Sequence, residues 1–164
     1  MSMIITPSHT CGPLFGFAIL PEGLARSTEA SDPDAIFLSG EIRDEKGHLG
    51  LEAFVEIFSP GQAVRVRTHG GRYEALVRRP AAQCLADGRP EAAHLTILIH
   101  ARGLVRHLMT RAYLADADLA QDPVAGLVAP GLHPALRLRP GRDARHFTFD
   151  ITLRGEGESV FFDF

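Results

Sequence analysis

The sequence has no excess of basic residues, because 17 lysines and arginines face 20 aspartates and glutamates over 164 residues, giving a formal net charge of -3. A protein without a global positive field is not drawn onto nucleic acid or acidic membrane surfaces. No apolar run reaches the roughly 20 residues that a membrane-spanning helix needs. We therefore expect a soluble protein that binds neither nucleic acid nor membrane.

Cysteine is also scarce, and the two present, Cys11 and Cys84, form neither a C-x-x-C pair nor a metal-ligand cluster. The first residues lack the basic region and long apolar core of a secretion signal. Both observations predict a cytoplasmic location. The sequence contains no G-x-S-x-G, H-E-x-x-H or phosphate-binding glycine motif, which argues against an independent enzyme with its own site of a common type.

Short stretches of two-residue periodicity, bounded by glycine, proline and aspartate, dominate the sequence and are typical of half-buried strands. In 145–154, for example, Phe147, Phe149 and Ile151 alternate with polar residues. The expected strands are 14–20, 36–43, 51–58, 63–67, 73–78, 95–100, 110–114, 145–154 and 159–162. Many short strands without intervening helices predict an all-β fold, an antiparallel β-sandwich.

Turn residues suggest how some of these strands connect. The segment 44–48 (DEKGH) predicts a hairpin that pairs strands 36–43 and 51–58, and Arg102-Gly103 predicts a second hairpin. The prolines of 115–135 limit this region to short helical turns on a long surface excursion. We expect two parts, an N-terminal arm and loop over 1–34 and a sandwich over 35–164.

Four stretches in order carry a family resemblance: 6–13 (TPSHTCGP), 38–44 (LSGEIRD) with Gly47-His48, 94–114, and 155–164 (GEGESVFFDF). Together they resemble the intradiol ring-cleaving dioxygenases. The opening and the ending are similar to those of the α-type chain in family members built from α and β chains. The resemblance runs from Thr6 to Phe164 with gaps in the middle. It implies an antiparallel β-sandwich, in agreement with the strand pattern.

The resemblance also implies a metal, Fe(III), held in the family by two tyrosinates and two histidines, the second two residues after the first. In this sequence His94 takes the first histidine position, but Thr96 takes the second. The segment 81–84 (AAQC) lacks the tyrosine of a catalytic chain. The sequence has two tyrosines in all, Tyr73 and Tyr113. We expect no metal ligand here, iron in a partner β-type subunit, and a hydrogen-bonded strand histidine at position 94.

By resemblance, the α-type chain completes a pocket in which a catechol acid such as protocatechuate is cleaved by O2 to a carboxymuconate. Arg102 is expected to bind the substrate carboxylate, because a guanidinium binds carboxylates in bidentate fashion. Thr10, Gly12 and Pro13 are expected to line the pocket, and no catalytic residue is expected in this chain alone. The alternatives are a solvated or salt-bridged Arg102, an arm that only docks on the partner, and a structural subunit without substrate contact.

The sequence also predicts the environment of the aromatic C-terminal segment and of a group of arginines. The aromatic ending 160–164 (VFFDF) is expected to pack mainly in the domain's own core, because exposing phenylalanine to water is unfavourable. Five arginines close in sequence are expected to form a solvated or subunit-facing basic patch. They are Arg65, Arg67, Arg72, Arg78 and Arg79.

Overall fold

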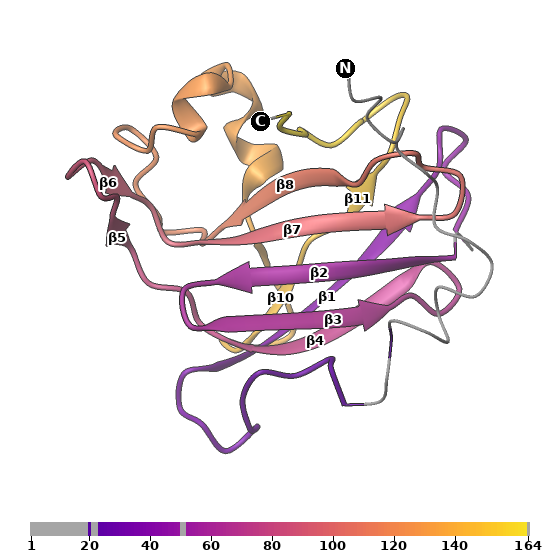
Figure 1. Cartoon of the computed structure of the whole chain (residues 1–164), viewed down its shortest axis with the longest axis horizontal. Helices are drawn as coiled ribbons and strands as arrows, with labels where there is room; N and C mark the ends of the chain where they lie inside the picture. Colours follow the sequence, from indigo (N-terminus) through magenta and orange to yellow (C-terminus); the bar gives the residue numbers. More distant parts are fainter. Residues whose placement is uncertain (1–19, 21–22, 50–51, 164) are drawn as a thin grey trace, which may run out of the picture.

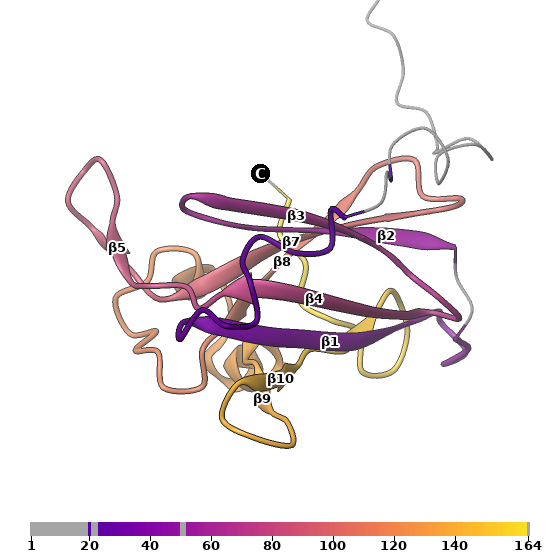
Figure 2. The same ribbon diagram turned by 90° about the horizontal axis from the view of Figure 1, so that it is seen from below.

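A computed structural model describes residues 20, 23–49 and 52–163. Two sheets pack face to face, with a small hairpin at one end (Figures 1 and 2). The strands are β1 (Ala35–Arg43), β2 (Ala53–Ser59), β3 (Gln62–Arg67), β4 (Arg72–Arg78), β5 (Gln83–Cys84), β6 (Pro90–Glu91), β7 (His94–Ala101), β8 (Leu108–Tyr113), β9 (Arg139–Pro140), β10 (His146–Thr148) and β11 (Ile151–Thr152). The predicted β-sandwich is therefore confirmed.

The two sheets have different pairing. One is a four-stranded antiparallel sheet in the order β3-β2-β7-β8. The other is built on β1, which pairs antiparallel with β4 on one edge and parallel with β10 and β11 on the other. The short β5–β6 hairpin extends away from both sheets (Figure 1).

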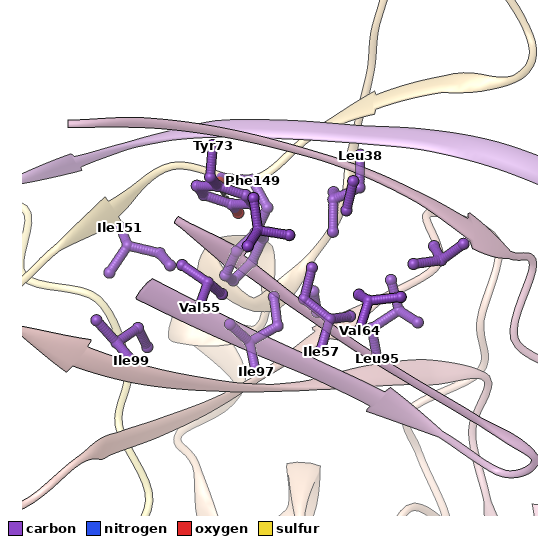
Figure 3. Close-up of a cluster of buried hydrophobic side chains, with 14 of the residues drawn as sticks. Leu38, Val55, Ile57, Val64, Tyr73, Leu95, Ile97, Ile99, Phe149 and Ile151 are labelled. Carbon is purple, nitrogen blue, oxygen red and sulfur yellow. Dashed lines mark hydrogen bonds between the residues drawn. The ribbon is translucent and has the colours of Figure 1, made fainter. Parts of the chain in front are cut away.

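The core lies between the sheets, where alternate residues of each strand point inward (Figure 3). Leu38 of β1, Val55 and Ile57 of β2, and Ile97 and Ile99 of β7 are all at most 1% exposed. Burying an aliphatic side chain of this size contributes about 1.5–3 kcal/mol relative to leaving it exposed. This layer of β-branched and leucine side chains is the main favourable term for the fold.

The predicted hairpin between 36–43 and 51–58 is wrong, because β1 and β2 belong to different sheets. The turn itself forms: Asp44 Oδ1 accepts hydrogen bonds from the backbone N–H groups of Lys46 (2.8 Å) and His48 (2.9 Å). In the folded chain, β4 occupies one edge of β1 and β10 and β11 occupy the other. β2 therefore lies in the other sheet. The predicted β7–β8 hairpin is confirmed.

The predicted strand 145–154 is divided into β10 and β11 at Phe149 and Asp150. Its alternation is confirmed, since Phe147, Phe149 and Ile151 are buried. At the break, the backbone N–H of Glu41 donates to Asp150 Oδ1 over 3.0 Å. A side-chain carboxylate thus accepts the hydrogen bond that a backbone carbonyl accepts elsewhere in a β-ladder. The expected strand 159–162 forms only a single bridge, between Phe162 and Met109. The expected strand 14–20 lies outside the described residues except for Leu20.

The excursion that follows β8 has the predicted short turns, η1 (Ala125–Leu127) and η2 (Pro130–Leu136). It is more than a surface loop, because Leu119, Ala125 and Leu136 form a second apolar cluster with Tyr113. Val160 and Phe162 pack against this cluster and Phe161 against the main core, which agrees with the expected packing of the C-terminal aromatics. No helix of the described part of the chain is long and apolar enough to cross a membrane.

The expected basic patch is largely neutralised. Arg65 pairs with Glu56, Arg72 with Glu41, Arg78 with Asp32 and Arg79 with Asp116. Glu56 is the cross-strand neighbour of Arg65 in the β2–β3 hairpin, whereas Glu41, Asp32 and Asp116 come from more distant parts of the sequence. The positive charge of the arginine-rich segment alone therefore did not indicate how many of its charges are paired in the fold.

Candidate functional site

The connection from β7 to β8 carries Arg102, the residue expected to face substrate. Gly103 has a φ of 94°, and the Leu104 N–H donates to the Ala101 carbonyl over 3.1 Å, so the chain turns tightly here. The Arg102 guanidinium lies 3.5 Å from a Glu52 carboxylate oxygen, and the two side chains are 64% and 54% exposed. An ion pair this exposed contributes little to stability.

The other residues expected at the substrate, Thr10, Gly12 and Pro13, lie outside the described residues. Their place in a pocket wall stays a prediction. Arg102 is exposed at the end of the four-stranded sheet, where either a substrate or a partner chain can reach it.

His94 and Thr96 lie two residues apart on the outer face of β7, since Leu95 and Ile97 between and after them point into the core. His94 Nδ1 donates to the Ala92 carbonyl over 2.8 Å, which confirms a hydrogen-bonded strand histidine. Burial lowers the pKa of His94, and the nearby Arg111 charge acts in the same direction. The imidazole is therefore held neutral.

Across from these residues, on β8, Arg111 is the centre of a buried ion network. Its guanidinium lies 2.8 Å from Glu91 and 3.9 Å from Asp122, and the three side chains are 13%, 5% and 0% exposed. Asp122 accepts hydrogen bonds from Tyr113 (2.9 Å) and from the Ala92 N–H (2.8 Å). Burial opposes the Asp122 charge, but these donors and Arg111 hold its pKa below the ordinary value.

Both tyrosines are structural hydrogen-bond donors. Tyr73 donates to the Phe149 carbonyl over 2.6 Å and Tyr113 to Asp122. Burial raises the pKa of each phenol far above its usual range. Neither side chain is a tyrosinate available to a metal.

The described residues do not fit the iron site that the family resemblance implies. Position 96 has no imidazole, both phenols are protonated donors, and a guanidinium occupies the adjacent strand position. Within the described ranges, no group of three or more histidine, cysteine, aspartate or glutamate side chains is placed to hold a metal ion. Fe(III) favours anionic oxygen donors, which this face does not offer free of other partners.

The network of Arg111, Glu91 and Asp122 was not predicted from the sequence. One signal was available: an arginine in the middle of an apolar strand, two residues before Tyr113, needs a buried acidic partner. Which carboxylates it meets could not be predicted, since Asp122 comes from the excursion and reaches the sheet only through the tertiary fold.

Comparison with solved structures defines the class of the fold. Catechol 1,2-dioxygenase from Acinetobacter sp. ADP1 superposes with a TM-score of 0.59 and 21% identity, over 82% of this chain and 58% of that chain. Hydroxyquinol 1,2-dioxygenase from Pseudomonas putida DLL-E4 gives 0.58 and 18%, over 90% and 67%. This chain thus spans little more than half of the first of these proteins. Its fold is the β-sandwich of intradiol dioxygenases.

Sequence comparison defines the family more narrowly, although no family model matches the chain. The protocatechuate 3,4-dioxygenase alpha chain of Pseudomonas putida is 30% identical over 97% of this chain and 96% of the relative. The alpha chain of the Burkholderia cepacia enzyme is 28% identical over 96% of both. The chain belongs to the family of protocatechuate 3,4-dioxygenase alpha chains.

Proposed function

We propose that this chain is the iron-free alpha subunit of a protocatechuate 3,4-dioxygenase and works in the cytoplasm beside an iron-binding beta subunit. The assembled enzyme cleaves protocatechuate between its two hydroxyl-bearing carbons, and both atoms of O2 enter the product, 3-carboxy-cis,cis-muconate. The Fe(III) of the partner supplies the redox chemistry, and this chain supplies part of the pocket.

One observation carries the iron-free part of the proposal. On the outer face of β7 and β8, where the family resemblance implies a metal, Thr96 lies opposite Arg111, and Arg111 is paired with Glu91. A face that already carries a buried cation and the neutral phenol of Tyr113 is a poor site for Fe(III). The family relationship over nearly the whole chain supports the subunit assignment.

In this proposal Arg102 orients the substrate. A guanidinium stays charged at every working pH and offers a planar pair of donors to a carboxylate. Binding the carboxylate of protocatechuate there would fix the direction of the ring and present its hydroxyl groups to the partner's iron. The arm over 1–34 contributes to the subunit interface and, through Thr10, Gly12 and Pro13, to the wall of the pocket beside the sandwich of 35–164.

The alternative function is a structural subunit that stabilises the assembly without touching substrate. It is favoured by the Arg102–Glu52 ion pair, because this contact gives Arg102 a partner within the chain. The two functions differ in whether substitutions at the β7–β8 connection change substrate binding in the assembled enzyme.

Co-expression with the beta chain of a protocatechuate 3,4-dioxygenase tests the proposal. The lone chain and the co-purified complex are compared for iron content by elemental analysis and for protocatechuate-dependent O2 uptake. We expect iron and activity in the complex and neither in the lone chain. Stoichiometric iron and activity in the lone chain would overturn the proposal.

A further inference from the structure

The outer face of β7 and β8 places a permanent positive charge next to potential metal ligands. Thr96 and Arg111 are directly opposite each other in the antiparallel register, and His94 lies two residues away on the same face. Side chains in these relations have Cβ atoms about 4.5–8 Å apart. An ion held by side chains at positions 94 and 96 would therefore lie beside the guanidinium.

The Arg111 guanidinium is stabilised in its buried position by ion pairs more than by hydrogen bonds. Its side chain is 13% exposed, and Nε and Nη1 have no hydrogen-bond partner among the described residues. Unmatched buried donors are unfavourable. Glu91 and Asp122, with side chains 5% and 0% exposed, supply the compensation, because two buried carboxylates need a nearby cation.

We propose that Arg111 is the resident cation of this face and excludes metal ions from it by charge, in addition to the missing second histidine. The inference rests on the proposed iron-free function and gives it a cause in this chain's own residues. Glu91 and Asp122 then serve as counter-ions of the guanidinium. A metal ion arriving here would meet a positive charge, because the same two carboxylates keep the guanidinium on this face.

The test introduces the missing histidine at position 96 and compares metal binding with and without the positive charge of Arg111. In the full-length chain, Thr96→His adds an imidazole in period-two spacing with His94. It is made alone, with Arg111→Leu, which removes the charge, and with Arg111→Lys, which keeps it. Binding of Co²⁺ alone is measured by titration calorimetry and by the visible absorption of the bound ion.

We expect T96H and T96H/R111K to bind Co²⁺ no better than the wild-type chain. T96H/R111L should bind it more than about tenfold tighter, because repulsion between a divalent ion and a nearby charge in a partly buried site exceeds a tenfold effect. Adding His94→Ala to T96H/R111L should abolish the gain. Equal affinities for T96H and T96H/R111L, or for the Lys and Leu variants, would overturn the inference.

Loss of Arg111 leaves two carboxylates without their cation, so the Leu variant needs a charge-balanced companion. T96H/R111L/E91Q removes one carboxylate and should show the same gain, with folding checked by circular dichroism. A folded triple variant without the gain contradicts the inference. None of these results depends on whether the wild-type chain binds iron, so failure here is distinguishable from failure of the proposed function.

Discussion

Arg102 and Glu52 form an exposed contact whose strength depends on what else reaches the β7–β8 connection. Without a ligand, the pair is worth little, because water competes for both groups. In a pocket closed by a partner chain, the same guanidinium would lose water and bind an anionic ligand more strongly. The proposed role of Arg102 therefore needs the assembled enzyme.

Replacing Arg102 by alanine should raise the KM of the assembled enzyme for protocatechuate roughly tenfold or more, because a charge-assisted hydrogen bond contributes about 1.5–3 kcal/mol. We expect a smaller change in kcat. Steady-state O2 uptake measures both constants. Arg106→Ala, on the same connection, should leave KM unchanged, and so should Glu52→Gln. Wild-type kinetics in the Arg102 variant would favour the structural alternative.

His94 should contribute a pH dependence to stability. Its folded-state pKa is lowered, first by burial, so the unfolded chain takes up the proton earlier as pH falls below about 6.5. The contribution of neutral His94 is present above this pH and is lost as pH falls toward the folded-state pKa. His100 shifts in the same direction.

Replacing His94 by asparagine keeps a donor for the Ala92 carbonyl but removes the titration. Urea unfolding at pH 7 and pH 5 should show a shallower loss of stability in this variant than in the wild type. The loss of stability between pH 7 and pH 5 should be smaller still in a double variant with His94→Asn and His100→Gln. Identical slopes for all three proteins would show that His94 titrates normally in the folded state.

At the scale of elements, the positions of the strands could be predicted and their partners only in part. Residues 36–43 and 73–78 alternate clearly because each has one face in the core. Nothing in these segments specifies that they pair with each other. The partner of β1 is set by how the whole chain packs into two sheets. A turn signal such as 44–48 marks a change of direction, not the sheet that follows.

Gly40 of β1 lies in close contact with the break between β10 and β11, a contact that could not be predicted from the sequence. A Cβ at Gly40 would collide with the Phe149 carbonyl oxygen and lie 2.7 Å from the Tyr73 ring. The missing side chain lets the Tyr73 hydroxyl reach that carbonyl from the neighbouring strand. Gly40, Tyr73 and Phe149 thus fix how β1 joins the C-terminal strands.

Gly40→Ala should destabilise the chain by about 1–3 kcal/mol, since added volume in a packed site forces the backbone to shift. Gly131→Ala is the control, because a Cβ there meets no atom within 4 Å. Thermal unfolding of both variants, alone or in the complex, measures the difference. Equal melting temperatures would mean that the contact at Gly40 is loose.

At the scale of the whole molecule, the sequence motifs indicated the family but not how the site is organised. The contact of Arg102 with substrate stays a prediction, but the turn that carries this residue could be predicted. The Arg111 network could not, because its carboxylates come from β6 and from the excursion after β8. An arginine inside an apolar strand signals a buried acidic partner, but the sequence around Arg111 does not indicate which carboxylates folding brings to it.

The location of iron in the assembled enzyme tests the central claim most directly. Crystals of the complex with a beta chain can be measured at the iron absorption edge, where an anomalous difference map marks each iron atom. We predict one peak per alpha–beta pair, in the beta chain and within reach of a substrate held by Arg102, with no peak beside His94. A peak at His94 and Thr96 would contradict the iron-free role of this chain.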